Sequence, residues 1–323
     1  MEQPRYIVTT TPHIRSRDSI ERTMLFVLIA LAPAAVLGVV FFGVRALFII
    51  LISVTSAVCF EALYQKLARK PVTVTDGSAV VTGLLLALIL PPGLPLWMPV
   101  VGAFAAIVLV KQLFGGLGHN FLNPALAARA MLMAAYALPM TVSFTAPRTA
   151  PDATASATPL MLLESGEFTP AGADFLASFL GNVGGSIGET SAVALLAGGV
   201  FLLATKVISW HIPVSFIASA AVFTALFHPE GFSGEVVGYH MLAGGLILGA
   251  FFMATDYPTS PVTPLGKILF GVGCGVITMV IRLYGGFPEG VAYAILLMNL
   301  TVPLIDRYIR PHVLGKRAKA GQP

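Results

Sequence analysis

Ten stretches of mainly apolar residues, most near 20 residues long, run through this chain and constrain its fold more than any other feature. A helix of about 20 apolar residues crosses the hydrocarbon core of a bilayer with all its backbone polar groups bonded internally. The chain is 56% hydrophobic and only 11% charged, whereas an ordinary soluble domain is roughly 25% charged. We therefore predict an all-α polytopic membrane protein with about ten transmembrane helices. The predicted spans are roughly 24–43, 45–65, 76–92, 94–113, 124–144, 189–208, 212–228, 236–254, 265–283 and 289–305.

The positions of the positive charges indicate how the chain is oriented. If the N-terminus lies inside, 15 of the 19 lysine and arginine residues fall in inner segments and 3 in outer segments, with Arg129 inside a span. Cytoplasmic loops of membrane proteins carry such an excess of positive charge. We therefore expect both termini in the cytoplasm, and the long loop between the fifth and sixth spans outside.

The predicted spans divide the chain into two halves around that loop. Five spans in each half would give the halves opposite topology. A pair of inverted five-helix halves is therefore one arrangement that the ten spans could adopt. The motifs Asp76-Gly-Ser-Ala-Val and Glu189-Thr-Ser-Ala-Val echo each other, but out of register with this division. The expected parts are a cytoplasmic N-terminal segment (1–23), a first membrane half (24–144), an extracytoplasmic loop (145–188), a second membrane half (189–305) and a basic cytoplasmic tail (306–323).

The remaining composition excludes several classes of function. Cys59 and Cys274 are isolated in apolar runs, and no CxxC or Cys/His cluster is present, so we expect no metal, iron–sulfur or c-type haem site in this chain. The net charge of +4 comes mainly from cations at helix ends, so nucleic-acid binding is not indicated.

One polar loop stands out between the apolar runs. Its segment Asp152-Ala-Thr-Ala-Ser156-Ala-Thr158 consists of small residues and lies between two prolines, which discourage helix formation. An enzyme could bind such a segment in extended form and join the phosphate of FMN to the hydroxyl of Thr158. The alternative is a plain outer linker rich in Ser, Thr, Ala and Pro.

Two predicted inner loops offer polar groups for a second ligand. In the first, a glycine-rich stretch leads to Asn123-Pro124, which begins a helix with Arg129 one to two turns further on. A helix N-terminus with a nearby arginine can hold an anionic group. In the second, Asp256 lies in Thr-Asp-Tyr-Pro-Thr-Ser-Pro. The alternatives are that Arg129 extends toward the cytoplasmic surface and that Asp256 only caps a turn.

These motifs resemble the RnfD family, which forms a membrane component of Rnf-type ion-translocating ferredoxin:NAD oxidoreductases, and the related NqrB family of sodium-translocating NADH:quinone oxidoreductases. The resemblance rests on the segment ending at Thr158 and on four further motifs. In the first segment, Ala155 and Ser156 replace the hydroxyl–glycine pair usual in the family. The further motifs begin at Thr75 (TDGSAVVTGLL), Gly115 (GGLGHNFLNPA), Ile187 (IGETSA) and Phe252 (FMATDYPTSPVT).

The resemblance implies a flavoprotein of the bacterial cytoplasmic membrane that works as one subunit of a redox-driven ion pump. It implies that FMN is attached to Thr158 by a flavin transferase, with Asp152 and Ser156 in the recognition motif. It also implies a second, non-covalent flavin such as riboflavin, for which Arg129, Asn123 and Asp256 are the candidate residues. The implied partners are the flavin-bearing RnfG-type subunit, iron–sulfur subunits and the lipid bilayer, and the chain is not expected to be active alone.

Three alternatives from the sequence stay open. The chain length favours an RnfD-like over an NqrB-like subunit, because NqrB is usually longer at its N-terminus. A secondary transporter or channel of similar helix count would need no flavin on Thr158. An assembly scaffold would carry no electrons at all.

Overall fold

The protein is a bundle of helices. The computed structural model describes residues 19–147, 158–164, 172–228, 233–285 and 289–310, and within these ranges it has helices but no strand. The longer helices are α1 (Ile20–Phe42), α2 (Val44–Leu67), α3 (Ser78–Leu88), α5 (Pro124–Ala135), α9 (Ala192–Ala204), α10 (His211–Phe227), α13 (Pro264–Tyr284) and α14 (Val291–Tyr308). The shorter elements are η1 (Val74–Asp76), α4 (Met98–Phe104), η2 (Ala105–Gln112), α6 (Ala137–Val142), α7 (Pro159–Glu164), α8 (Gly172–Leu180), α11 (Gly234–Leu242), α12 (Leu246–Leu248), η3 (Gly249–Met253) and η4 (Tyr257–Thr259).

Among these described residues, four helices are long and apolar enough to cross a bilayer by themselves, namely α1, α2, α13 and α14. The pair formed by α11 and α12–η3 is a fifth candidate, bent by 59° at a short break. Other apolar helices are shorter, with 10–17 residues. The prediction of an all-α polytopic membrane protein is therefore confirmed. Each of the ten apolar runs contains one or more of these helices, while the count of ten spans stays a prediction.

Two of the ten runs are broken inside. In the run 236–254 the break lies at Gly244 and Gly245, whose φ angles of 66° and 69° are left-handed. Glycine adopts this conformation without the steric cost that a Cβ atom brings. In the run 124–144, α5 ends at Ala135 and α6 begins at Ala137, with Tyr136 between them. The first break places irregular backbone inside the bundle, whereas the second lies at the exposed residue Tyr136.

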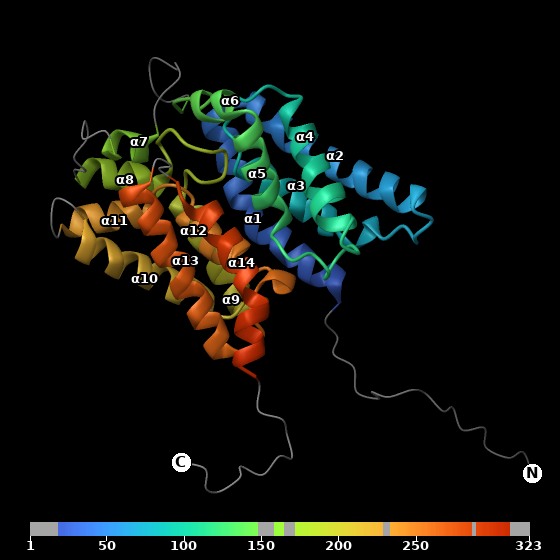
Figure 1. The fold of residues 1–323 in the computed structure, drawn as a ribbon. Coiled ribbons are helices and arrows are strands. Elements are labelled where there is room, and N and C mark those ends of the chain that lie inside the picture. Colours follow the sequence, from blue (N-terminus) through green and yellow to red (C-terminus); the bar gives the residue numbers. More distant parts are fainter. Residues whose placement is uncertain (1–18, 148–157, 165–171, 229–232, 286–288, 311–323) are drawn as a thin grey trace, which may run out of the picture.

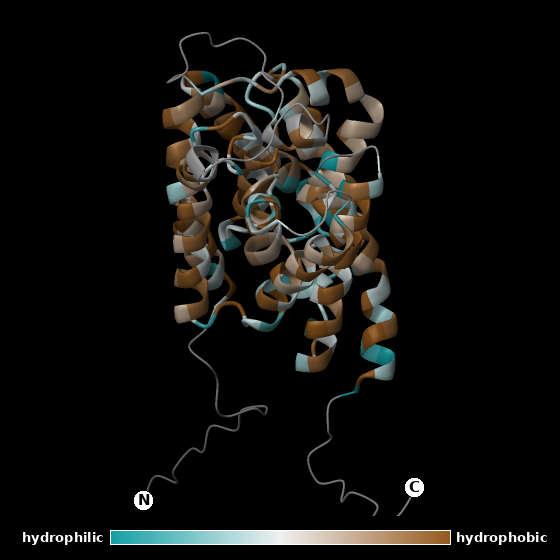
Figure 2. Cartoon of the chain, turned by 90° about the vertical axis from the view of Figure 1, so that its left-hand side faces the viewer, coloured by the Kyte–Doolittle hydropathy of each residue, from teal (hydrophilic) through white to brown (hydrophobic). Residues whose placement is uncertain are grey.

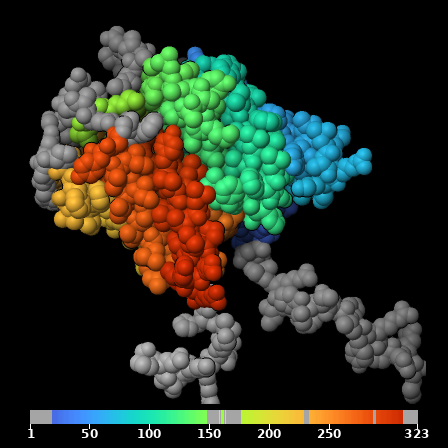
Figure 3. Space-filling view, in the orientation of Figure 1, coloured from blue at the N-terminus to red at the C-terminus, as the bar shows by residue number. Residues whose placement is uncertain are grey.

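The chain enters and leaves the bundle at the same end. α1 begins and α14 ends at one end, which we call the base, whereas α6 and α7 lie at the opposite end, which we call the top (Figure 1). Both described ends of the chain at the base agree with an even number of crossings. The space-filling view shows the red helix α14 lying against the green segment that contains α5 (Figure 3).

The chain returns from the top into the core at the end of α3. The backbone N–H of Gly188 donates to the carbonyl of Leu88 at 2.8 Å, and that of Ile187 donates to Leu90 at 3.2 Å. These bonds satisfy carbonyls that the last turn of a helix leaves free. A Cβ on Gly188 would lie 2.6 Å from the Cβ of Leu88, so the close approach requires glycine. The junction buries Glu189, which lies just before α9.

A second junction joins the start of α5 to the end of η3. The side-chain oxygen of Asn123 accepts from the N–H groups of Ala125 and Leu126 at 3.1 and 3.3 Å, which caps α5. Its amide group donates to the carbonyl of Met253 at 3.2 Å. One side chain therefore satisfies the ends of two helices from distant parts of the chain.

The outer surface of the bundle is largely apolar. Figure 2 shows hydrophobic residues along most of the helices, with hydrophilic residues at helix ends and in patches inside the bundle. Large apolar side chains such as Val36 and Val40 of α1, Leu226 of α10 and Leu304 of α14 are more than half exposed. A surface of this kind suits lipid or other membrane helices rather than water.

Candidate functional site

Thr158 is a buried residue at the start of α7, near the top of the bundle. Its side chain is 7% exposed, and its hydroxyl oxygen accepts a hydrogen bond from the backbone N–H of Met161 at 3.3 Å. The sequence predicts this hydroxyl in an extended segment within reach of an enzyme. The structure places it instead at the first turn of a short helix packed on the bundle, while Asp152 and Ser156 of the same motif lie outside the described residues.

A cavity of about 160 Å³ opens beside Thr158, and we call it the Thr158 cavity. Arg129 and Glu289 supply its charged groups, and most of its other lining is apolar or aromatic, with Met133, Phe144 and Tyr293 among it. A smaller cavity of about 30 Å³ also borders Thr158 and is lined in part by Glu189 and Glu289. Thr158 therefore borders both cavities, and Glu289 does so as well.

Four charged residues form a group next to Thr158, which we call the top cluster: Arg129, Glu189 and Arg282, which are buried, and Glu289, whose side chain is 20% exposed. The Nη1 of Arg129 donates to the carboxylate of Glu189 at 3.2 Å, and its Nη2 donates to that of Glu289. These contacts join α5, the start of α9 and the start of α14. A charge inside the membrane is costly unless it is paired, so the two carboxylates account for the burial of Arg129.

Arg282 has a different environment from Arg129. Its guanidinium donates to the backbone carbonyls of His240, Ala243 and Gly244 at 2.6, 3.1 and 2.9 Å. It also donates to the backbone carbonyl of Glu289 at 3.1 Å. The carbonyl of His240 belongs to the last turn of α11, and those of Ala243 and Gly244 belong to the break between α11 and α12. Arg282 therefore stabilises the unwound segment of the bent span.

A second charged group lies near the base, where the side chains of Lys111 and Glu61 are only 2% and 1% exposed. The Nζ of Lys111 lies 2.9 Å from a carboxylate oxygen of Glu61 and donates to the hydroxyl of Ser78 at 2.7 Å. The amide of Gln112 donates to Glu61 at 2.6 Å, and Asp76 accepts from the Ser78 hydroxyl at 2.6 Å. We call these residues the base cluster.

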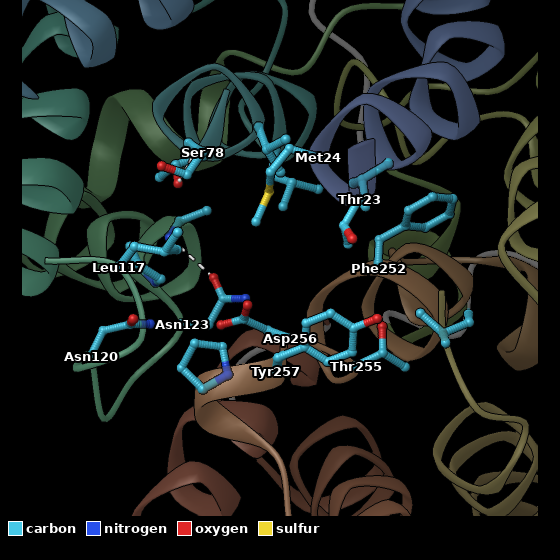
Figure 4. A pocket seen from close by; sticks show the side chains of 18 of the residues that line it. Thr23, Met24, Ser78, Leu117, Asn120, Asn123, Phe252, Thr255, Asp256 and Tyr257 are labelled. Carbon is cyan, nitrogen blue, oxygen red and sulfur yellow. Dashed lines mark hydrogen bonds between the residues drawn. The ribbon is translucent and has the colours of Figure 1, made fainter. Parts of the chain in front are cut away.

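A cavity of about 90 Å³ adjoins the base cluster, and we call it the base cavity. Ser78 and Met24 lie on one side of it, across from Asn123 and Asp256 (Figure 4). The apolar part of the lining includes side chains of α1, α3 and η3. The polar side chains that line it are Thr23, Ser78, Thr82, Lys111, Asn120, Asn123, Thr255, Asp256 and Tyr257.

Asp256 lies in the loop between η3 and α13, outside the spans. Burial raises the pKa of its carboxyl from the ordinary 3.8 to about 6. Hydrogen bonds from Thr259 and Asn120 and the charge of Lys111 act in the opposite direction and lower the pKa. The carboxyl therefore titrates closer to neutral pH than an ordinary aspartate does.

The structure groups the predicted site residues differently from the sequence. Asn123 and Asp256 meet at the base cavity, as expected for two inner loops. Arg129, expected to join them, lies instead at the Thr158 cavity. The difference has a simple geometric cause, because Arg129 is six residues beyond Asn123 and about 9 Å further along the axis of α5.

Sequence reasoning missed the pairing of the buried charges. The charge pattern assigns Lys111 to an inner segment and Arg282 to an outer one, although each lies within a largely apolar helix. A cation at such a position needs a buried anion or a set of carbonyls. That requirement points to a carboxylate such as Glu61 for Lys111, but this partner lies 50 residues away in the chain.

The apolar helices, some interrupted within a run, and the paired buried charges define a polytopic membrane protein with two internal polar sites. Its sequence matches the NQR2, RnfD, RnfE family over residues 7–315, and the chain belongs to this family. The resemblance drawn from the motifs is thereby confirmed.

Three relatives cover nearly the whole chain, and each is the D subunit of its complex. The one from the sodium-translocating ferredoxin:NAD oxidoreductase complex of Acetobacterium woodii is 48% identical, covering 99% of this chain and 100% of its own length. The one from the proton-translocating ferredoxin:NAD oxidoreductase complex of Clostridium ljungdahlii is 44% identical, covering 97% of both chains. The one from the ion-translocating oxidoreductase complex of Escherichia fergusonii is 38% identical, covering 96% of this chain and 98% of its own length.

Proposed function

We propose that this chain is the membrane D subunit of an ion-translocating ferredoxin:NAD oxidoreductase complex, and that it carries electrons through an FMN joined to Thr158. The full-length identity to D subunits of such complexes supports the first part. The burial of Thr158 beside an apolar cavity with a cation at its wall supports the second. A bound flavin would supply one- and two-electron transfer, while the chain would supply position and electrostatics.

The residues at the Thr158 cavity fit a flavin. A flavin has a flat aromatic ring with a polar carbonyl edge, and ligand sites of this kind are mostly apolar with a few placed polar groups. Met133, Phe144 and Tyr293 would contact the ring, and Arg129 would meet a polar edge or the phosphate. The proposal also requires that attachment precede the final packing of α7, because the Thr158 hydroxyl is buried in the packed state.

We further propose that the base cavity holds a second, non-covalent flavin such as riboflavin. Asn120, Asn123 and Asp256 would bind the polar edge of such a ring, among apolar groups of α1, α3 and η3. Arg129 is not part of this proposal, because it lines the other cavity. Two flavin sites, one near the top and one near the base, would give electrons a route along the bundle.

The topology proposed for this subunit has all ten apolar runs in the membrane, the base in the cytoplasm and the top outside. The position of both described ends of the chain at the base supports it (Figure 1). The partners would be the other members of the complex, including the flavin-bearing RnfG-type subunit and iron–sulfur subunits, with a flavin transferase for maturation. One relative is named for sodium and one for proton translocation, so the similarity does not select the ion.

The flavin proposal is tested by comparing two hydroxyl variants made in the presence of the flavin transferase. Thr158→Ala should lose the flavin fluorescence of the denatured chain but still insert in the membrane. Thr141→Ala removes another hydroxyl from the same cavity and should keep the fluorescence. A wild-type chain without covalent flavin, beside a control protein that the transferase does modify, would favour a transporter or scaffold.

A further inference from the structure

Arg129 is the one cation among the described residues that line the Thr158 cavity. The other lining groups are Glu289, hydroxyls, and apolar or aromatic residues. The side chain of Arg129 is nearly fully buried, so water does not weaken its charge as it would at the surface. Whatever binds in this cavity next to Thr158 therefore meets one strong positive group.

The hydrogen bonds of Arg129 do not resemble those of a cation that only holds the fold together. Arg282 binds four backbone carbonyls, whereas Arg129 binds two carboxylates and no described backbone carbonyl. A guanidinium has five N–H donors, and the two bonds to Glu189 and Glu289 leave donors for a further acceptor. Arg129 also lines the Thr158 cavity.

The charges of the top cluster are balanced before any ligand binds. Arg129 and Arg282 carry two positive charges, and Glu189 and Glu289 carry two negative charges. A flavin bound here would bring additional negative charge into this low-dielectric site when it is reduced. Among the cavity-lining residues described, Arg129 is placed to stabilise that charge, and Glu289 is placed to oppose it.

We propose that Arg129 is the positioning residue for the flavin carried by Thr158, binding the polar carbonyl edge of the ring and raising its reduction potential. Glu289 shares the guanidinium of Arg129 and lowers that potential. The proposal rests on the attachment of flavin at Thr158. It assigns Arg129 to this flavin rather than to the second one at the base.

The two residues should therefore change the potential in opposite directions. Arg129→Gln removes the positive charge, so the reduced flavin is stabilised less and the potential falls. A tenfold loss of relative affinity for the reduced form corresponds to about 59 mV for a one-electron step, and we expect at least that. Glu289→Gln removes the negative charge and leaves Arg129 with Glu189 as its one carboxylate partner among the described residues, so the potential should rise. Arg129→Lys keeps the charge without the planar fork and should lie between wild type and Arg129→Gln.

The experiment is a redox titration of the purified complex, followed by visible absorption. The signal lost in the Thr158→Ala complex identifies the flavin concerned. Arg45→Gln is the matched control, because Arg45 binds the carbonyls of Gly93 and Leu94 and lines neither cavity beside Thr158. Its potential should equal that of the wild type.

Peptide mass spectrometry on each variant separates the two ways in which the idea can fail. An unmodified Thr158 in the wild-type complex would contradict the proposed function itself. If Thr158 is modified but its flavin has the same reduction potential in all variants, only the role of Arg129 would be overturned. Shifts of Arg129→Gln and Glu289→Gln in the same direction would also overturn it, because they would indicate general loosening of the site.

Discussion

The ammonium group of Lys111 lies 2.9 Å from the carboxylate of Glu61, and the two side chains are only 2% and 1% exposed. The pair joins α2 to η2, a π-helical segment that ends next to the base cavity. π-helical turns are uncommon and often lie at functional sites. The pair is thus a structural support of the wall against which we place the second flavin.

Glu61→Gln should destabilise the protein strongly, because it leaves the Lys111 charge buried without its anion. Breaking a buried ion pair from one side typically costs about 3–5 kcal/mol. The double variant Glu61→Leu/Lys111→Met should be more stable than either single change, since no charge stays unpaired. The check is the thermal unfolding temperature of the purified protein in detergent. If each single change lowers the unfolding temperature no more than the double change does, the result would contradict the importance of the pair.

Gly245→Ala should disturb the top cluster at the break in the bent span. The residue has a left-handed φ of 69°, and an added Cβ would lie 2.5 Å from a carboxylate oxygen of Glu189. The backbone alone costs roughly 1–2 kcal/mol, and displacement of Glu189 adds to it. Gly118→Ala is the matched control, because its φ is also left-handed at 89° but the space around it is open.

Thermal unfolding again provides the measurement for this pair of glycines. Gly118→Ala should lower the unfolding temperature by the backbone cost alone. Gly245→Ala should lower it clearly more. Equal losses would mean that Glu189 moves aside freely and that the top cluster is loosely held.

Asp256 should make stability depend on pH in the acidic range. Its pKa is raised from 3.8 to about 6 in the folded protein, so the folded state binds the proton more tightly than the unfolded state. The contribution of Asp256 to the free energy of unfolding is fully present below about pH 4 and is lost as the pH rises through about 6. In Asp256→Asn this pH-dependent part should disappear. Unfolding temperatures across this pH range test the sign, and a wild-type contribution that instead grows with pH would refute it.

Asn123→Ala should lower the content of non-covalent flavin, because Asn123 lines the base cavity and also caps α5. Loss of the cap alone costs about 1 kcal/mol. Ser191→Ala serves as the control, since Ser191 caps α9 with a bond to Ala194 but does not line the base cavity. Flavin released by acid from the purified complex is the quantity to measure. A loss of equal size in both variants would assign the effect to the cap and not to the cavity.

The helices of this protein can be predicted well from the sequence, since hydropathy alone marks every apolar run. The same signal cannot mark the breaks within runs, because Gly244 and Gly245 are flanked by apolar residues on both sides. Hydropathy also does not show how the apolar runs are aligned against one another in the bundle. The count of crossing helices stays a prediction for that reason, since several runs form helices too short to span a bilayer alone.

The sequence predicts the candidate site only in part. Thr158, Asn123 and Asp256 lie at cavities, and the motifs that contain them identify the family. The place of Arg129 beside Thr158 could not be foreseen, because its partners Glu189 and Glu289 are 60 and 160 residues away in the chain. Such contacts depend on how helices pack, and local sequence carries no information on them.

The mass of the peptide that contains Thr158, isolated from the assembled complex, tests the central proposal most directly. We predict that the peptide is heavier than its sequence by one FMN less a water, and that fragmentation places the addition on Thr158. The same peptide at its unmodified mass, from a complex that transfers electrons at the normal rate, would contradict the proposal that this subunit carries electrons through Thr158.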